Sequence, residues 1–269
     1  QQFFNPQLKE LLDPLLMEDM DKAVERINSA IEKNERILVY GDYDADGTTA
    51  VALVYNFLRR RYTNLDYYIP DRYNEGYGVS YQGVDYASET GVKLVIVLDC
   101  GIKAIQEIRY AKEKGIDFIV CDHHVPDDEL PPAVAILNAK REDSTYPFKH
   151  LSGCGVGFKL MHAFALSNEI PFTELIPSLD LVAISTASDI VPIMGENRVL
   201  TYYGLQQLNS NPSIGLRAII QVCKLSDKVL TINDIVFKIG PRLNAAGRMS
   251  SGKKAVDLLV EQDYSRALE

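Results

Sequence analysis

The feature of this sequence that most constrains its fold is the alternation of short apolar runs with longer amphipathic stretches. Four runs have the length of a buried strand, at residues 37–40, 67–69, 94–98 and 118–120. Helical periodicity follows at residues 48–61 and 105–114. Strands that alternate with helices form right-handed crossover units, which build a parallel sheet covered on both faces. We therefore predict an α/β fold, with a parallel sheet flanked by helices.

After about residue 150 the pattern changes from alternation to consecutive helices. Four stretches favour helix, at residues 155–168, 175–186, 199–208 and 214–223. The sequence shows no internal repeat, low-complexity tract or Gly/Ser linker. We expect a mostly helical region behind the sheet, followed by the start of a connecting helix.

Acidic residues and histidines follow three of the predicted strands directly. The strand at 37–40 runs into Gly-Asp-Tyr-Asp-Ala-Asp-Gly at residues 41–47, the strand at 94–98 into Asp99, and the strand at 118–120 into residues 121–124, Cys-Asp-His-His. Asp189 follows an apolar predicted helix and is a fourth candidate. Since reactive groups gather at the carboxyl edge of a parallel sheet, we expect these side chains to lie together.

The first acidic motif resembles the opening of an EF-hand calcium loop. Asp42, Asp44 and Asp46 match that opening, but the twelfth position, which needs a glutamate, is Leu53. A predicted strand also precedes the motif, where an EF-hand needs a helix. Capping of the following helix explains one aspartate, but it does not explain three, whose mutual repulsion needs cations to offset it.

Carboxylates combined with one or two imidazoles suit manganese, or magnesium with less selectivity. The absence of a cysteine cluster disfavours a zinc ribbon. Two ions about 4 Å apart would clamp a phosphate, generate hydroxide and stabilise the leaving oxygen. The acidic motifs therefore predict phosphodiester hydrolysis with two Mn²⁺ ions, for which Mg²⁺ is a substitute.

The formal net charge of -9 argues against a protein that grips nucleic acid over its whole surface. Local charge differs, because residues 238–254 contain five basic side chains and no acid, and residues 59–61 are three consecutive arginines. Each cluster is either a contact to a nucleic-acid backbone or a solvated face. Four scattered cysteines and the lack of a signal region or membrane-length apolar run make a reduced cytoplasm and no membrane association the expectation.

Together the acidic motifs resemble those of the DHH phosphoesterase superfamily, whose name comes from the Asp-His-His of residues 122–124. Three further stretches narrow the resemblance to RecJ-type nucleases: PDRYNEGYG at residues 70–78, LSGCGVGFKL at 151–160 and GPRLNAAGRM at 240–249. The resemblance implies a 5′ to 3′ exonuclease of single-stranded DNA that acts in DNA repair and recombination.

The resemblance also implies roles for particular residues. The implied metal ligands are Asp44, Asp46, Asp99, His123 and Asp189. Three residues would act in catalysis: Asp42 would bind metal or orient the site, Asp122 would hold an imidazole, and His124 would touch the scissile phosphate. Substrate phosphates would be held by Arg242, Asn244 and Arg248, for which a helix-capping segment is the structural alternative.

The domain organisation implied by the resemblance is a DHH catalytic domain over residues 1–240, with an α/β part at about 30–150 and a helical part at 151–240. Residues 241–269 would contact substrate and begin a connector to a DHHA1 domain that is missing here. We expect such a fragment to bind metal but to hydrolyse DNA weakly or not at all. A monomer is expected, with a helicase or single-strand-binding protein as a partner.

Two alternatives stay open at this point. One is a DHH-family oligoribonuclease or cyclic dinucleotide phosphodiesterase, which would share the metal residues but act on shorter substrates. The other is a non-catalytic DHH scaffold, against which the intact acidic set argues.

Overall fold

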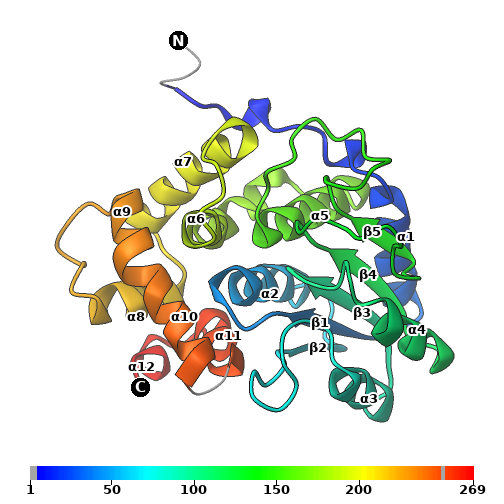
Figure 1. Ribbon diagram of the computed structural model, residues 1–269. Coiled ribbons are helices and arrows are strands. Elements are labelled where there is room, and N and C mark those ends of the chain that lie inside the picture. The colour runs from blue at the N-terminus through cyan, green and yellow to red at the C-terminus, as the bar shows by residue number, and fades with distance from the viewer. Residues whose placement is uncertain (1–4, 250–251) are drawn as a thin grey trace.

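A five-stranded parallel sheet lies at the centre of the computed structural model, which describes residues 5–249 and 252–269 (Figure 1). The strands are β1 (Arg36–Gly41), β2 (Leu65–Tyr68), β3 (Val92–Leu98), β4 (Asp117–Cys121) and β5 (Ala135–Leu137). Their spatial order is β2-β1-β3-β4-β5, and all four neighbouring pairs are parallel. The predicted α/β class is confirmed.

Helices cover both faces of the sheet because successive side chains of a strand point to opposite sides. In β1, Ile37 and Val39 enter one apolar core and Leu38 and Tyr40 enter the other. The first core is completed by α1 (Met20–Glu32), α2 (Ala45–Leu58) and α5 (Gly153–Ser167), and the second by α3 (Tyr81–Glu89) and α4 (Ile105–Glu113) (Figure 1). The candidate functional site lies at the carboxyl edge of the sheet.

The remainder of the chain is helical. Its helices are α6 (Leu179–Ser188), α7 (Gly195–Ser210), α8 (Ile214–Val222), α9 (Ile232–Asp234), α10 (Gly240–Met249), α11 (Gly252–Val260) and α12 (Tyr264–Leu268). Short 3₁₀ turns lie at Leu8–Glu10, Pro14–Leu16, Phe172–Glu174 and Ile176–Ser178, and a π-helical turn at Ile235–Ile239. Helices α10 and α11 return to pack beside α2, so the end of the chain lies against the helix that follows β1 (Figure 1).

Several helix boundaries differ from the sequence prediction: α7, for example, begins at Gly195 and not at residue 199, and α2 ends at Leu58 and not at residue 61. Helix α2 begins at Ala45 and not at residue 48, because the Asp44 side chain accepts a hydrogen bond from Gly47 N and caps the helix. Helix α6 begins at Leu179 and not at residue 175, since Pro177 lies in a separate 3₁₀ turn. The three-residue β5 is too short to stand out as an apolar run.

A buried ion pair joins α5 to α7. Lys159 is fully buried, and its Nζ lies 2.7 Å from Oε1 of Glu196, which is 3% exposed. Tyr146 donates its hydroxyl to the other carboxylate oxygen of Glu196. The backbone of Leu12 donates to Glu196 and accepts from Lys159. This cluster therefore fixes the N-terminal segment to two helices.

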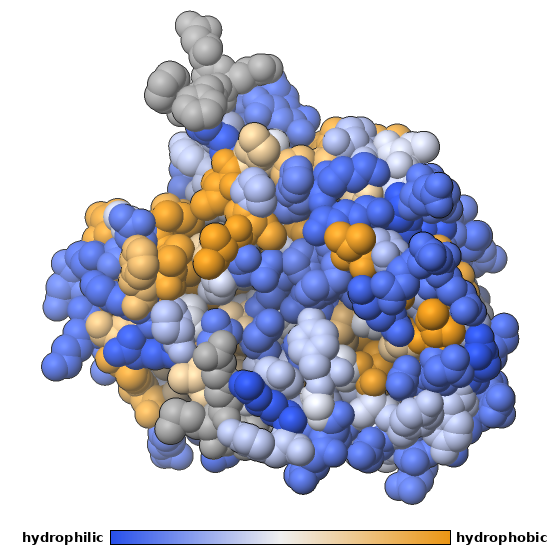
Figure 2. All heavy atoms as spheres, in the orientation of Figure 1, coloured by the Kyte–Doolittle hydropathy of each residue, from blue (hydrophilic) through white to orange (hydrophobic). Residues whose placement is uncertain are grey.

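Apolar side chains gather on the visible surface over α9 and the neighbouring ends of α6 and α7 (Figure 2). Exposed hydrophobic residues next to these helices include Ile190 and Met194, between α6 and α7, and Phe237, in the π-helical turn after α9. Across residues 5–249 and 252–269, none of the helices combines the length and the apolar character needed to cross a membrane.

Candidate metal centre

The acidic loop after β1 places three carboxylates around the start of α2. Asp42 directly follows the strand and is completely buried. Asp44 is the N-cap residue, and Asp46 lies in the first turn of α2 with an exposed fraction of 2%. Only three residues separate the strand from the helix, so the carboxylates are held close together.

Asp46 is held by the amino end of α5. The backbone N–H groups of Gly153 and Cys154 donate to its two carboxylate oxygens at 2.7 and 2.8 Å. The hydroxyl of Ser185, from α6, lies 2.6 Å from Oδ1 and completes the cradle. A helix amino end stabilises negative charge, so this arrangement orients Asp46 without a cationic side chain. Sequence reasoning did not assign Ser185, although it singled out the stretch that contains Gly153.

Asp99 follows β3 in the left-handed backbone region, with φ of 61°, and is 1% exposed. The space beside it is open only because residue 153 is a glycine. A Cβ atom built at Gly153 would lie 2.5 Å from Oδ1 of Asp99. The start of α5 therefore supports Asp46 and makes room for Asp99 at the same time.

His123 lies where the carboxylates converge. Its Nε2 is 3.1 Å from Oδ1 of Asp99, 3.6 Å from Oδ2 of Asp46 and 3.7 Å from Oδ2 of Asp189. Asp189 reaches this point as the C-cap residue of α6. Three strand ends and one helix end thus supply the cluster, as the strand-end pattern predicted.

The donor atoms of this cluster fit a divalent cation. Oδ1 of Asp99 and both ring nitrogens of His123 are buried, and none has a hydrogen-bond partner within the described parts of the chain. Ligand atoms within 4.8 Å of one another form two groups, Asp99–His123–His124 and Asp46–His123–Asp189. Oxygen ligands with imidazole suit Mn²⁺, and Mg²⁺ less selectively. Asp42 and Asp44 belong to neither group.

The pKa shifts report the same crowding of charge. Burial and the neighbouring Asp44 raise the pKa of Asp42 to about 7. Burial together with Asp46 and Asp44 raises the pKa of Asp189 to about 7, and burial with the same two neighbours raises that of Asp99 well above its ordinary value. The cluster therefore binds protons strongly, and a cation would compete with them for the carboxylates.

Asp122 and His124 form a hydrogen-bonded pair beside the cluster. Nδ1 of His124 lies 2.7 Å from Oδ1 of Asp122, and Ile102 N donates to the other oxygen. This hydrogen bond raises the pKa of His124. Burial of His123 lowers its pKa, although the nearby acids oppose that shift. The two adjacent histidines therefore differ: His123 favours the neutral form that can ligate, and the 44%-exposed side chain of His124 favours the charged form.

The three residues expected to hold substrate phosphates lie on α10, in different environments. Asn244 accepts a hydrogen bond from Ala45 N at 2.8 Å, so it contacts the first residue of α2, directly after the acidic loop. Arg242 is exposed and donates to the carbonyl of Lys238 in the preceding turn. The side chain of Arg248 lies outside the described residues.

A cavity of about 400 Å³ opens beside the cluster and is lined in part by Tyr77, Cys100, Asp122 and His124. The Tyr77 hydroxyl donates to the carbonyl of Asp99 at 3.3 Å, and its ring meets the His124 ring edge-on. Substrate that reached the metal cluster through this cavity would pass an aromatic side chain and a histidine.

Comparison with protein families agrees with this geometry. A model described as the DHH family, N-terminal domain, matches residues 36–186. This range includes β1 to β4, the acidic loop, both histidines and the start of α5. It ends just before Asp189.

Among curated proteins, the chain is 41% identical over 267 residues to the single-stranded-DNA-specific exonuclease RecJ of Bacillus subtilis (strain 168), covering 99% of this chain and 33% of the relative. It is 38% identical to the protein of the same description from Escherichia coli (strain K12), covering 92% of this chain and 45% of the relative. The chain thus spans between a third and a half of these relatives.

Two solved structures resemble the fold closely. The crystal structure of exonuclease RecJ bound to manganese has a TM-score of 0.86 and 33% sequence identity, and the match covers 96% of this chain and 64% of that one. RecJ from Thermus thermophilus in complex with Mn²⁺ has a TM-score of 0.83 and 30% identity, over 98% of this chain and 37% of that one.

Proposed function

Since this chain belongs to the DHH family, we propose that its metal centre hydrolyses the phosphodiester bonds of single-stranded DNA, one nucleotide at a time from the 5′ end. The observation that carries the proposal is the convergence of Asp46, Asp99 and Asp189 on Nε2 of His123, at 3.1 to 3.7 Å. The similar proteins described as single-stranded-DNA-specific exonucleases support the choice of substrate.

Two divalent cations would be held in this cluster. The proposed ligands are Asp44, Asp46, Asp99, His123 and Asp189. Asp99 and His123 lie at the centre of the set; the two carboxylate oxygens of Asp99 could serve both ions, whereas His123 would ligate one. Solved relatives contain Mn²⁺ or, in one case, Mg²⁺, which supports the choice of metal. When bound, the cations would polarise the phosphate and acidify the attacking water.

The chain's own residues would orient the reacting groups. Asp122 holds His124 through Nδ1 and raises its pKa, so that Nε2 of the protonated ring would be able to donate to a phosphate oxygen. Asp42, which is completely buried in the acidic loop, would bind metal or orient the site. Arg242 and Arg248 remain candidates for contacts to substrate phosphates farther along the strand.

The proposed division of the chain follows from these roles. Residues 1–240 would form the DHH catalytic domain, and residues 241–269 would contact substrate and begin a connector. A helicase or a single-strand-binding protein would be the partner of the complete enzyme, and a monomer its oligomeric state.

Release of labelled nucleotides from single-stranded DNA with Mn²⁺ tests the proposal. The substrates carry a label at the 5′ or the 3′ end, and the proteins are the wild type, Asp99→Asn and the control Asp128→Asn. Asp128 is exposed and has no role in the cluster, so the control removes the same charge without touching a proposed ligand. We expect early release of the 5′ label by the wild type and the control, and loss of release in Asp99→Asn.

The assay uses both this chain and a version extended to the length of its relatives, so that a weak activity of the shorter form is distinguished from the absence of activity. Long strands left intact by the extended protein, with dinucleotides cleaved, would overturn the proposed substrate but not the chemistry. Release that is equal in the wild type and Asp99→Asn would overturn the metal centre as its source.

A further inference from the structure

The three consecutive arginines after α2 have different environments. Arg61 pairs with Glu174 and donates to the carbonyl of Phe57, and Arg59 donates to the carbonyl of Val260 at 2.8 Å. Arg60 is exposed, and among the described residues it has neither a hydrogen bond nor an ion pair. One guanidinium of the run is therefore left without a structural role.

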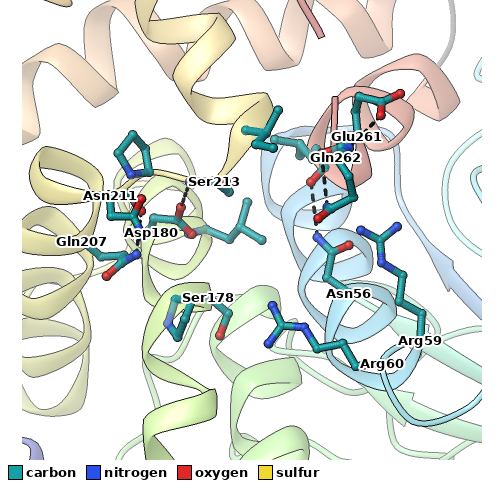
Figure 3. A pocket seen from close by; sticks show the side chains of 15 residues that line it. Asn56, Arg59, Arg60, Ser178, Asp180, Gln207, Asn211, Ser213, Glu261 and Gln262 are labelled. Carbon is teal, nitrogen blue, oxygen red and sulfur yellow. Dashed lines mark hydrogen bonds between the residues drawn. The ribbon is translucent and has the colours of Figure 1, made fainter. Parts of the chain in front are cut away.

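Arg60 lines a cavity of about 490 Å³, a size typical of small-molecule sites. We call it the α2–α8 pocket; its lining comes from α2, the start of α6, the segment from α7 to α8, and the turn between α11 and α12. Figure 3 shows the Arg60 guanidinium directed across the pocket toward Ser178. Asp46 and Arg60 are separated by most of α2, about 20 Å at the helical rise per residue, so this pocket is distinct from the metal centre.

The opposite walls of the pocket differ in chemistry. The α2 wall carries the two guanidinium groups of Arg59 and Arg60. The facing wall carries the side-chain amides of Gln207 and Asn211 (Figure 3), whereas the carboxylate of Asp180 beside them is fully buried. A ligand that fits both walls has an anionic end and a part rich in hydrogen-bonding groups.

Asn56 adds a requirement for a donor. Its Nδ2 donates to the carbonyl of Leu259, which fixes the orientation of the amide. Its Oδ1 is buried and has no partner within the described parts of the chain. Asn56 belongs to the same wall as Arg59 and Arg60, so its unsatisfied acceptor would favour a ligand that carries a hydroxyl or N–H group close to its anionic end.

The acidic residues of the lining limit the size of the anion. Asp180 is fully buried, and both its oxygens accept backbone hydrogen bonds, from Leu181 and Ser213. Glu261 lies on the α11–α12 turn. These carboxylates would repel a strand with many phosphates but would tolerate a single phosphate beside Arg60.

We propose that the α2–α8 pocket binds a nucleoside monophosphate, with its phosphate at Arg60, its sugar hydroxyl toward Asn56 and its base against the amide wall. This inference rests on the proposed function, because nucleoside monophosphates are the product class of that reaction. The pocket would then be a second product site, one helix length away from the metal centre.

Binding of dAMP in EDTA, measured by calorimetry, tests the pocket without nuclease activity. The proteins are the wild type, Arg60→Ala, the control Arg109→Ala and Asp99→Asn. Arg60 and Arg109 are both exposed arginines at helix surfaces, so neither replacement endangers the fold. We expect one dAMP per chain in the wild type, Arg109→Ala and Asp99→Asn, and at least a tenfold weaker affinity in Arg60→Ala. Deoxyadenosine and inorganic phosphate should each bind more weakly than dAMP.

The inference would be overturned by no dAMP binding by the wild type, by equal binding by Arg60→Ala, or by loss of binding in Asp99→Asn. Displacement of dAMP from Asp99→Asn by a single-stranded oligonucleotide at lower concentration would also overturn it, by assigning the pocket to nucleic acid. Since the measurement contains no metal, its result is independent of whether the chain cleaves DNA. An inactive nuclease that binds dAMP would overturn the proposed function alone.

Discussion

Gly153 lies so close to Asp99 that a Cβ atom at residue 153 would come within 2.5 Å of the carboxylate oxygen Oδ1. The same glycine donates its backbone N–H to Asp46 at 2.7 Å. A single residue at the start of α5 thus sets the positions of two proposed ligands, one by a hydrogen bond and one by leaving space.

Gly153→Ala should therefore weaken metal binding by displacing Asp99. We expect the affinity for Mn²⁺ to fall roughly tenfold to a hundredfold, as for other residues that orient metal ligands. Gly155→Ala is the matched control, because a Cβ atom there meets its nearest neighbours at 3.4 Å. Calorimetric titration with Mn²⁺ measures both variants, and equal affinities would contradict the crowding at Asp99.

Asn244→Leu should loosen the start of α2, because it removes the acceptor for Ala45 N. We expect weaker Mn²⁺ binding and a loss of about 1 kcal/mol in the free energy of unfolding. Asn244→Asp keeps an acceptor and should retain most of the affinity. If Asn244 served only as a phosphate contact, Asn244→Leu would raise KM for DNA and leave Mn²⁺ affinity unchanged.

Lys159→Met should destabilise the protein by about 3–5 kcal/mol, because it leaves Glu196 charged and buried without its partner. The double variant Lys159→Met/Glu196→Gln should recover much of this loss, since it removes both charges. Urea unfolding of the wild type, the two single variants and the double variant gives the coupling energy. Additive effects of the single changes would show that the two charges are not coupled.

His162→Phe should protect the protein against mild acid. Burial, with Lys159 nearby, lowers the pKa of His162 to about 4, so the folded state holds the neutral imidazole. The unfolded state binds a proton near pH 6.5, and stability from this group is therefore present above pH 6.5 and lost as the pH falls toward 4. Between about pH 7 and pH 5 the wild type should lose on the order of 1 kcal/mol more than His162→Phe. Urea unfolding at both pH values measures the difference; equal losses would contradict the shift.

The sheet and the convergence of acids were predictable because both depend on local patterns. Apolar runs of strand length mark β1, β3 and β4, and parallel pairing brings the residues that follow them to one edge. Because Asp99 and His123 follow the ends of neighbouring strands, the pattern predicts that their side chains lie close together.

The supports of the site were not predictable in this way. Ser185 lies in an apolar helix and resembles an ordinary small core residue, yet its hydroxyl reaches Asp46 from 139 positions away. The resemblance implied that Asn244 contacts DNA phosphates, and nothing in its basic segment indicated that its amide accepts a hydrogen bond from Ala45 N. Such contacts depend on how α5, α6 and α10 pack around the loop, and no local periodicity encodes that packing.

The hydrogen bond between Ala45 and Asn244 joins residues 199 positions apart. During synthesis, at roughly 5–20 residues per second, the acidic loop is made about 10 to 40 seconds before the side chain that fixes it. Until α10 docks, the carboxylates repel one another without that restraint. Stable acquisition of metal should thus follow the docking of α10, and a bound divalent cation should mark molecules in which α10 has reached its place.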